Sequence, residues 1–210
     1  MEKYHFFRNP DAGQLGVILF FALSGFLITY LLLTEEKKTR TISIKDFYIR
    51  RILRIWPLYY FLVLICFFVL PYIHFFDIPY IEGSFSTRNL ILYLLILPNV
   101  VLLALEYAVP YLSHSWSVGV EEQFYIMWPV LMKFVKKRQR LLIGVIVVYL
   151  LVKFALLPLI IDITGSYHVF LFSKVWNKFN IDCMAIGGLF ALWHFQKKPI
   201  IKVLYNPILN

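Results

Sequence analysis

The stretch "LGVILFFALSGFLITYLLL", residues 15–33, decides the fold class because it carries no charged side chain over a length that can cross a bilayer. A spanning helix needs about 20 mostly apolar residues. Stretches of similar character cover 56–76, 116–135, 141–161 and 179–195. We therefore predict an all-α fold, a polytopic integral membrane helical bundle with about five spans.

Composition points the same way. Of the 210 residues, 60% are hydrophobic and 16% are charged, whereas a soluble domain is nearer half apolar and a quarter charged. The lipid bilayer is therefore the expected partner. The net charge of +9 does not indicate nucleic acid, since the Lys and Arg residues concentrate in 34–55, 133–140 and 197–202, between apolar runs. Such basic loops are typical of the cytoplasmic side, which predicts a multi-pass protein of the inner (plasma) membrane.

The apolar run 89–106 is marginal in length and is broken by Pro98 and Asn99. If all three basic loops are cytoplasmic, the number of crossings is consistent only when this run does not cross completely. We interpret it as a re-entrant or tilted segment on the outer side, with protein or water around its broken backbone. The alternative is that it crosses and one basic loop lies outside, because the charge rule is statistical.

The stretch "HSWSVGVEEQFYIMWP", residues 114–129, differs from the apolar runs around it. On a helix, His114, Ser117, Glu121 and Tyr125 would share one face, and Glu122 would point about 100° away. A carboxylate at membrane depth costs about 2.5 to 3.5 kcal/mol, so two in succession are expected to face protein or water. We predict that they line a site.

Two other interpretations of this stretch stay open. The carboxylates could lie at the membrane interface in structural bonds, with Trp116 and Trp128 as aromatic anchors. A hydrolase triad of Ser117, His114 and Glu121 is disfavoured, because nothing resembles the Gly-x-Ser-x-Gly turn that presents a serine nucleophile.

The segment "FYIRRILRIWPLYY", residues 47–60, holds three arginines at the cytoplasmic mouth of a predicted helix. Helical spacing brings Arg54 close to both Arg50 and Arg51. Guanidinium groups stay charged and bind phosphate oxygens in a forked geometry, so the cluster suits a nucleotide-like cofactor arriving from the cytoplasm. A basic juxtamembrane cluster is also a common topology signal and a contact for anionic lipid headgroups.

Other features are less specific. Gly16, Ser24 and Gly25 form a small-residue face that favours close helix packing. Asp182 lies in an apolar run, where a lone carboxylate is often a helix cap, and His5 lies just before the short loop that leads into the run 15–33. The two cysteines, Cys66 and Cys183, lie in apolar segments, and we infer neither a disulfide nor a metal site from them.

The order and wording of these motifs resemble the acyltransferase-3 family of integral membrane acyltransferases, many of which O-acetylate bacterial surface polysaccharides. The family pattern reads approximately G-V-D-x-F-F-x-x-S-G-F-L-I-T, F-x-x-R-R-x-x-R-I-x-P-x-Y, H-x-W-S-L-S-V-E-E-Q-F-Y-x-x-W-P and a weaker R-x-D-x-x-x-x-G. The matching segments are Gly16 to Thr29, Phe47 to Tyr59, His114 to Pro129 and Asp182 to Gly187. The chain departs from the pattern at Ile18, Gly119 and Asn180, where Asp, Ser and Arg are common.

The resemblance implies transfer of an acyl group, usually acetyl, from acyl-CoA to a hydroxyl of a glycan or lipid-linked sugar, without a metal. Arg51 and Arg54 match the family's Arg-x-x-Arg pair, expected to bind the CoA phosphates with Arg50 nearby. Glu121 and Glu122 match the family's paired carboxylates and would face the transfer cavity. His5 stands where members carry an essential histidine, so we expect it to be the general base, with Glu121 as its orienting group or as an alternative base.

Members of the family are longer, with about ten spans. We therefore interpret residues 1–210 as a single membrane acyltransferase domain that is partial, lacking most of the first span and the C-terminal spans. Two alternatives stay open: a transporter-like membrane protein that uses Glu121, Glu122 and Asp182 as a polar path, and an inactive truncated remnant of the acyltransferase. A transporter would not need the arginine pair.

Overall fold

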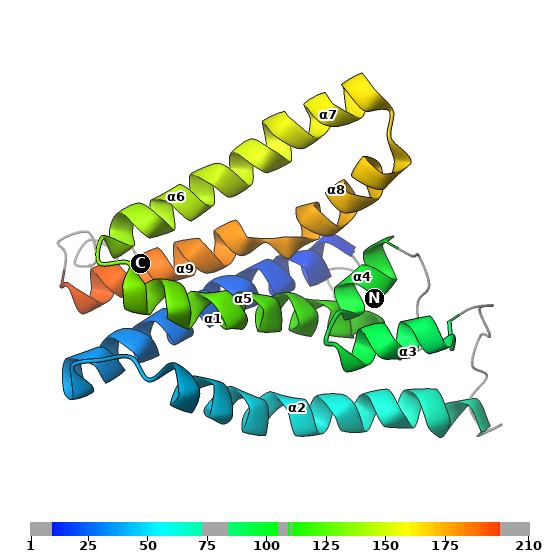
Figure 1. Cartoon of the computed structure of the whole chain (residues 1–210), viewed down its shortest axis with the longest axis horizontal. Coiled ribbons are helices and arrows are strands. Elements are labelled where there is room, and N and C mark those ends of the chain that lie inside the picture. The colour runs from blue at the N-terminus through cyan, green and yellow to red at the C-terminus, as the bar shows by residue number, and fades with distance from the viewer. Residues whose placement is uncertain (1–9, 73–83, 105–108, 110, 198–210) are drawn as a thin grey trace, which may run out of the picture. The chain divides into compact units, whose positions relative to one another are not determined.

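The computed structural model describes residues 10–72, 84–104, 109 and 111–197. Within those residues all regular secondary structure is helical, as the sequence predicts (Figure 1). The α-helices are α1 (Pro10–Thr39), α2 (Ile44–Phe68), α3 (Thr87–Leu94), α4 (Pro98–Ala104), α5 (Trp116–Phe134), α6 (Arg138–Leu151), α7 (Leu157–Thr164), α8 (Tyr167–Phe179) and α9 (Ile181–Phe195). Short 3₁₀ turns cover Leu70–Tyr72 and Ser113–Ser115, and a π-helical turn, Val152–Leu156, joins α6 to α7.

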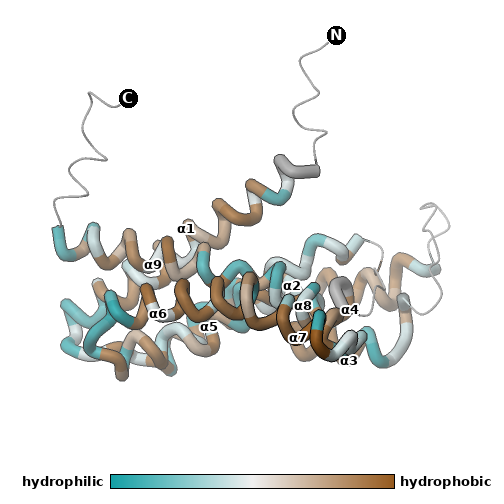
Figure 2. The backbone as a smooth tube through the Cα atoms, turned by 90° about the horizontal axis from the view of Figure 1, so that it is seen from above, coloured by the Kyte–Doolittle hydropathy of each residue, from teal (hydrophilic) through white to brown (hydrophobic). Residues whose placement is uncertain are grey.

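Three helices are long and apolar enough to cross a membrane: Gly13–Thr39, Ile44–Tyr72 and Arg138–Thr164. Figure 2 shows hydrophobic residues along much of α1 and α6. Large apolar side chains such as Leu19, Leu53 and Phe154 are exposed on these helices. Exposed apolar side chains in such numbers require an apolar solvent, so this is a membrane protein.

Two other predicted spans have shorter counterparts. The 19 residues of α5 match the predicted span 116–135. Helix α9 has 15 residues, about 22 Å of helix against a hydrocarbon core of about 30 Å. The number of crossings therefore stays a prediction.

Three boundaries differ from the sequence prediction. Helix α2 begins at Ile44 rather than at residue 56, because the hydroxyl of Ser43 caps it by accepting the backbone N–H of Asp46 at 3.4 Å. The arginines therefore lie inside α2 and not at its mouth. Residues 162–178, which lie between the predicted spans 141–161 and 179–195, contain the end of α7 and most of α8. His114 lies in the 3₁₀ turn before α5 and not on that helix.

The run 89–106 is broken, as its Pro98 and Asn99 predict. It forms α3 and α4, separated at Ile96, whose φ of 58° is left-handed. The N–H of Leu97 returns to the carbonyl of Leu92 at 2.8 Å, and Pro98 opens α4, a position where its missing N–H costs nothing.

The chain divides into two compact units, each described separately. The first unit contains Met1–Ile42, Pro129–Pro158 and Asn180–Asn210, and the second contains Ser43–Trp128 and Leu159–Phe179. In the first unit α9 packs against both α1 and α6. In the second unit α2 and the α3–α4 segment share a core around Tyr59, Phe67, Tyr93 and Val101.

The contact between α1 and α9 depends on glycine. A Cβ at Gly25 would lie 2.0 Å from the carbonyl oxygen of Met184, and one at Gly187 would lie 1.9 Å from that of Ala22. Gly16, predicted to belong to the same small-residue face, has open space around it instead. Gly25 and Gly187 are therefore points of close approach between α1 and α9, and Ser24, next to Gly25, is buried.

Candidate functional site

The second unit encloses a cavity of about 510 Å³ between α2, the α3–α4 break and α5. Two of the stretches singled out from the sequence, 47–60 and 114–129, contribute to the same wall. The lining residues are Tyr48, Arg51, Ile52, Trp56, Tyr60, Leu94, Leu95, Ile96, Leu97, Glu122, Gln123, Tyr125 and Ile126. The cavity is therefore mostly apolar, with one guanidinium and one carboxylate facing it.

The paired carboxylates of α5 are both buried, with Glu121 6% and Glu122 7% exposed. Only Glu122 lines the cavity, because consecutive helical positions point about 100° apart. Glu122 Oε2 accepts a hydrogen bond from the indole Nε1 of Trp56 at 3.1 Å. Its other oxygen, Oε1, is buried without a hydrogen-bond partner among the described residues. A substrate hydroxyl or water could satisfy that oxygen.

Arg51 is the cationic group of the cavity. Its guanidinium lies over the ring of Tyr125, 5.2 Å from the centroid, and 5.7 Å from the ring of Phe47. It is half-buried and within electrostatic reach of Glu121 and Glu122. The two rings hold the planar group in place, and nearby carboxylates offset the cost of its partial burial.

The three predicted arginines do not share one position. Arg50 and Arg54 are exposed and do not line the cavity, although the charge of Arg54 lies close enough to interact with that of Arg51. Helical spacing correctly places Arg51 and Arg54 near each other, but only Arg51 turns toward the cavity.

The break between α3 and α4 is fixed to α5 by an amide pair. Asn99 Nδ2 donates to Gln123 Oε1 at 3.3 Å, and Gln123 Nε2 donates to Asn99 Oδ1 at 3.1 Å. Gly119, one turn before Gln123, allows the close approach, because a Cβ there would lie 2.8 Å from Cδ of Pro98. This contact holds residues 95–97 against the cavity.

The sequence interpretation missed the aromatic wall. Tyr48, Ile52, Trp56 and Tyr60 recur every four residues along α2 and all line the cavity. Tyr48 donates its hydroxyl to the carbonyl of Ile126, and Tyr60 donates to that of Leu94 at 3.0 Å. The sequence signal for this face is the four-residue spacing of these side chains, which places them on one side of a helix.

His114 and Ser117 are not part of the cavity. His114 is exposed, and the hydroxyl of Ser117 donates to the backbone carbonyl of His114 at 3.2 Å. His114 lies in the turn before α5 and not on that helix, so its predicted alignment with Glu121 stays a prediction. The hydroxyl of Ser117 bonds to a backbone carbonyl, which gives no support to the disfavoured serine triad. Trp128 is buried rather than placed as an interfacial anchor.

Ser24 and Asp182 belong to the first unit. Ser24 is buried on α1, and Asp182 lies in the first turn of α9, where its Oδ1 is buried without a hydrogen-bond partner among the described residues. Nearby, the hydroxyl of Tyr149 accepts the backbone N–H of Asn180 at 3.0 Å. His5, the predicted base, lies outside the described residues. No group of three or more metal-ligating side chains occurs in the part of the chain that the structure describes.

Comparison with known proteins gives a family and relatives. A family model described as an acyltransferase domain matches residues 2–209. The peptidoglycan O-acetyltransferase OatA of Listeria monocytogenes is 30% identical over 219 residues, which cover 99% of this chain and 34% of that protein. The O-acetyltransferase OatA of Staphylococcus aureus strain NCTC 8325 is 32% identical over 164 residues, 74% of this chain and 26% of that protein. The chain thus spans about a quarter to a third of the length of these relatives. No solved structure matches it.

Proposed function

Since this chain belongs to the acyltransferase-3 family, we propose that it acts as a multi-pass enzyme of the inner (plasma) membrane that transfers an acyl group, acetyl in the simplest case, from acyl-CoA to a carbohydrate hydroxyl. The single observation that carries the proposal is the cavity of the second unit, where Arg51 and Glu122 meet from two distant motifs. We take residues 1–210 to be one acyltransferase domain, part of a longer arrangement in the relatives.

The acceptor is proposed to be a glycan or a lipid-linked sugar outside the cytoplasm. Support comes from the relatives, one of which is named for O-acetylation of peptidoglycan. A sugar hydroxyl is a weak nucleophile, so it needs a base and a donor with a good leaving group. A thioester supplies that leaving group, and the reaction then needs no metal.

In the proposed step, the acceptor oxygen attacks the thioester carbonyl carbon, a C–O bond forms and the C–S bond breaks. The hydroxyl proton passes to the base and then to the departing thiolate, which leaves as free coenzyme A. His5 is the proposed base, with Glu121 as its orienting group or as an alternative base. Glu122 is the carboxylate best placed to meet the acceptor, since it lines the cavity whereas Glu121 does not, and its Oε1 has no hydrogen-bond partner among the described residues.

The donor is proposed to be held by Arg51, whose guanidinium can bind phosphate oxygens through forked hydrogen bonds. Its stacking on Tyr125 leaves the donor edge of the guanidinium available while the face is covered. Arg50 and Arg54, exposed on the same helix, are proposed to contact the phosphates outside the cavity. His114, Ser117, Ser24 and Asp182 are assigned structural roles.

The test measures donor binding and transfer separately. Purified chain in detergent should bind acetyl-CoA, and Arg51→Gln should weaken binding by about tenfold or more, because a charge-assisted hydrogen bond contributes about 1.5 to 3 kcal/mol. Lys45→Gln, an exposed charge removed elsewhere on α2, is the matched control. Membranes containing the protein should then move label from radioactive acetyl-CoA to an extracytoplasmic glycan.

Each outcome has a distinct meaning. Binding that is unchanged by Arg51→Gln and by Arg51→Ala with Arg54→Ala would show that the donor site is elsewhere. Binding without transfer would indicate the inactive remnant. Absence of both, together with movement of a solute across vesicles that depends on Glu122, would favour the transporter-like alternative.

A further inference from the structure

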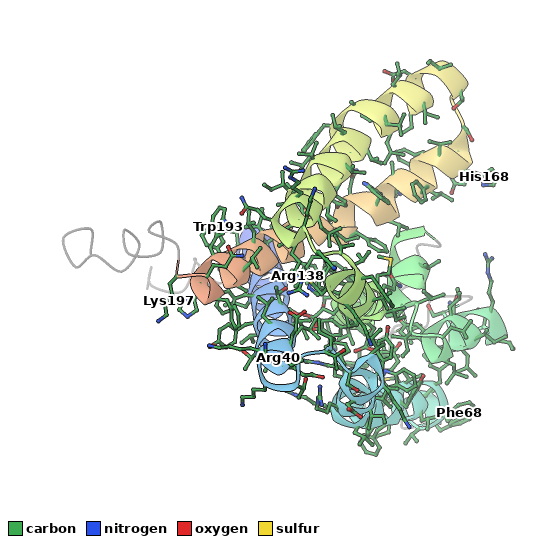
Figure 3. The ribbon with its side chains drawn as sticks, turned by 60° about the vertical axis from the view of Figure 1, so that its left-hand side comes forward. Arg40, Phe68, Arg138, His168, Trp193 and Lys197 are labelled. Carbon is green, nitrogen blue, oxygen red and sulfur yellow. The ribbon has the colours of Figure 1, made fainter. Side chains whose placement is uncertain are left out.

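A second cavity, of about 600 Å³, lies in the first unit, where the C-terminal part of α1, the start of α6 and the end of α9 meet. Figure 3 labels Arg138, which opens α6 at this place. The lining residues are Leu33, Glu36, Lys136, Lys137, Arg138, Gln139, Arg140, Ile143, Leu192, Phe195 and Gln196. None of them belongs to the proposed acyl-transfer site.

The lining carries a surplus of positive charge. Glu36 is its one carboxylate, and both its oxygens accept from Arg138, at 2.6 Å from Nη1 and 2.8 Å from Nη2. Arg138 also donates from Nε to the carbonyl of Met132 at 3.0 Å, so three of its five N–H groups are hydrogen-bonded and its orientation is fixed. Lys136, Lys137 and Arg140 add three cations to the lining without a further carboxylate. An anion is the ligand that this balance favours.

The rest of the lining includes apolar side chains. Leu33 is the last apolar residue of α1 before Thr34 and Glu35, and Leu192 and Phe195 lie at the end of α9. Ile143 lines the cavity and is 42% exposed, and Val147, one turn further along α6, is 47% exposed. The cavity therefore continues into an apolar track on the outer face of α6. An acyl chain would bury its apolar surface along such a track, whereas a soluble phosphate compound has no apolar chain to bury there.

The cavity lies at the position along α1, α6 and α9 that is expected for a lipid headgroup. Polar residues follow Leu33 in α1, precede Leu141 in α6 and follow Phe195 in α9. This is the depth at which hydrocarbon gives way to headgroups, and basic pockets between membrane helices bind anionic phospholipids. We propose that this cavity binds one anionic phospholipid, with its phosphate on Lys136, Lys137 and Arg140 and one acyl chain along Ile143 and Val147.

The experiment uses the whole chain, purified in an uncharged detergent, and a fluorescent short-chain phosphatidylglycerol, with the matching phosphatidylcholine as the neutral probe. Phosphatidylglycerol should bind at least tenfold more tightly than phosphatidylcholine. The triple variant Lys136→Gln, Lys137→Gln, Arg140→Gln should lose most of that preference. The control Arg40→Gln, Lys45→Gln, Lys133→Gln removes the same charge from residues outside the lining and should bind within about twofold of the native chain.

Three results would overturn the proposal: equal binding of the two lipids, equal effects of the two triple variants, or displacement of phosphatidylglycerol by coenzyme A or pyrophosphate at lower concentration than by unlabelled phosphatidylglycerol. The last result would assign the cavity to a soluble phosphate compound. If the triple variant fails to fold, salt dependence in the native chain decides. Binding of phosphatidylglycerol should weaken between 50 and 500 mM salt, about tenfold more than binding of phosphatidylcholine, and equal salt responses would contradict an electrostatic site.

Discussion

At the scale of single residues, the bond from Trp56 to Glu122 connects the two motifs of the proposed site, 66 positions apart in the sequence. It satisfies one carboxylate oxygen, and the other is buried without a hydrogen-bond partner among the described residues. Without the indole N–H the carboxylate would be free to turn, and a buried acceptor would lose its donor. Trp56 is therefore expected to act as a positioning residue for Glu122.

Trp56→Phe keeps most of the aromatic volume and removes only the N–H. We expect acyl transfer per folded protein to fall about tenfold or more, in line with the about 1.5 to 3 kcal/mol of a hydrogen bond to a charged group. Trp56→His, which can donate, should recover part of the rate. Trp116→Phe, a tryptophan of the same unit outside the cavity lining, is the control. Equal rates for the two Phe variants would remove Trp56 from the mechanism.

The two pairs of charged residues near the cavity could be predicted from the sequence, but not which member of each pair lines the cavity. The cost of a carboxylate at membrane depth identifies Glu121 and Glu122, and the helical spacing of a basic cluster identifies Arg51 and Arg54. Spacing alone cannot choose between Glu121 and Glu122, or between Arg51 and Arg54, because that choice depends on how α2 and α5 rotate about their axes when they pack. Trp56 could not be predicted as part of the site, because aromatic residues are common in membrane helices near the interface and do not by themselves indicate function.

At the scale of the helices, the contact of α1 with α9 depends on two glycines. Gly187→Ala would place a methyl group 1.9 Å from the carbonyl oxygen of Ala22 and 2.9 Å from the N of Phe26. Backbone atoms cannot move aside as a side chain can, so the helices must separate. We expect a loss of about 1 to 3 kcal/mol, or more, in the free energy of unfolding.

Thermal unfolding in detergent measures this loss. Gly144→Ala in α6 is the matched control, because nothing lies within 4 Å of its added methyl group, and alanine should even favour the helix slightly. If both variants unfold at the same temperature, the close approach of α1 and α9 is wrong.

The amide pair between α4 and α5 predicts energetic coupling. Removing either side chain leaves the other, buried Asn99 or half-buried Gln123, without its partner. Asn99→Leu and Gln123→Leu should therefore each destabilise, and the double variant should cost less than their sum. We expect a coupling of about 0.5 to 2 kcal/mol. A double-mutant cycle by unfolding measures it. As a control, the losses of stability from Asn99→Leu and from Thr87→Ala, an exposed position on α3, should be additive. Additive losses for Asn99→Leu and Gln123→Leu would contradict the hydrogen bonds between these two side chains.

At the scale of the whole molecule, the topology can be tested by labelling. With Cys66 and Cys183 replaced by alanine, a cysteine at Thr41, Lys137 or His168 reports which side of the membrane each loop occupies. An impermeant maleimide added to intact cells should label His168→Cys but neither Thr41→Cys nor Lys137→Cys, because basic loops stay inside. Lysed cells give full labelling as the control. Labelling at Lys137 with protection at Thr41 would mean that 89–106 crosses the membrane.

The helical membrane class and the family could be predicted from sequence, since long charge-free runs and ordered motifs identify them. Helix ends could not. Ser43 starts α2 well before the apolar run, because capping fixes a helix end and lipid depth does not. Helix α8 mixes Lys174 and Lys178 with aromatic residues, so a search for long apolar runs interprets it as a loop.

The glycine contact also bears on biosynthesis. Gly25 leaves the ribosome early, while its neighbour Met184 follows 159 codons later, roughly 8 to 30 seconds at 5 to 20 residues per second. During that interval the surface of α1 around Gly25 has no α9 to pack against. Lipid or another helix must cover that surface until α9 is made, so a chain truncated before residue 181 should be less stable in the membrane than one that includes α9.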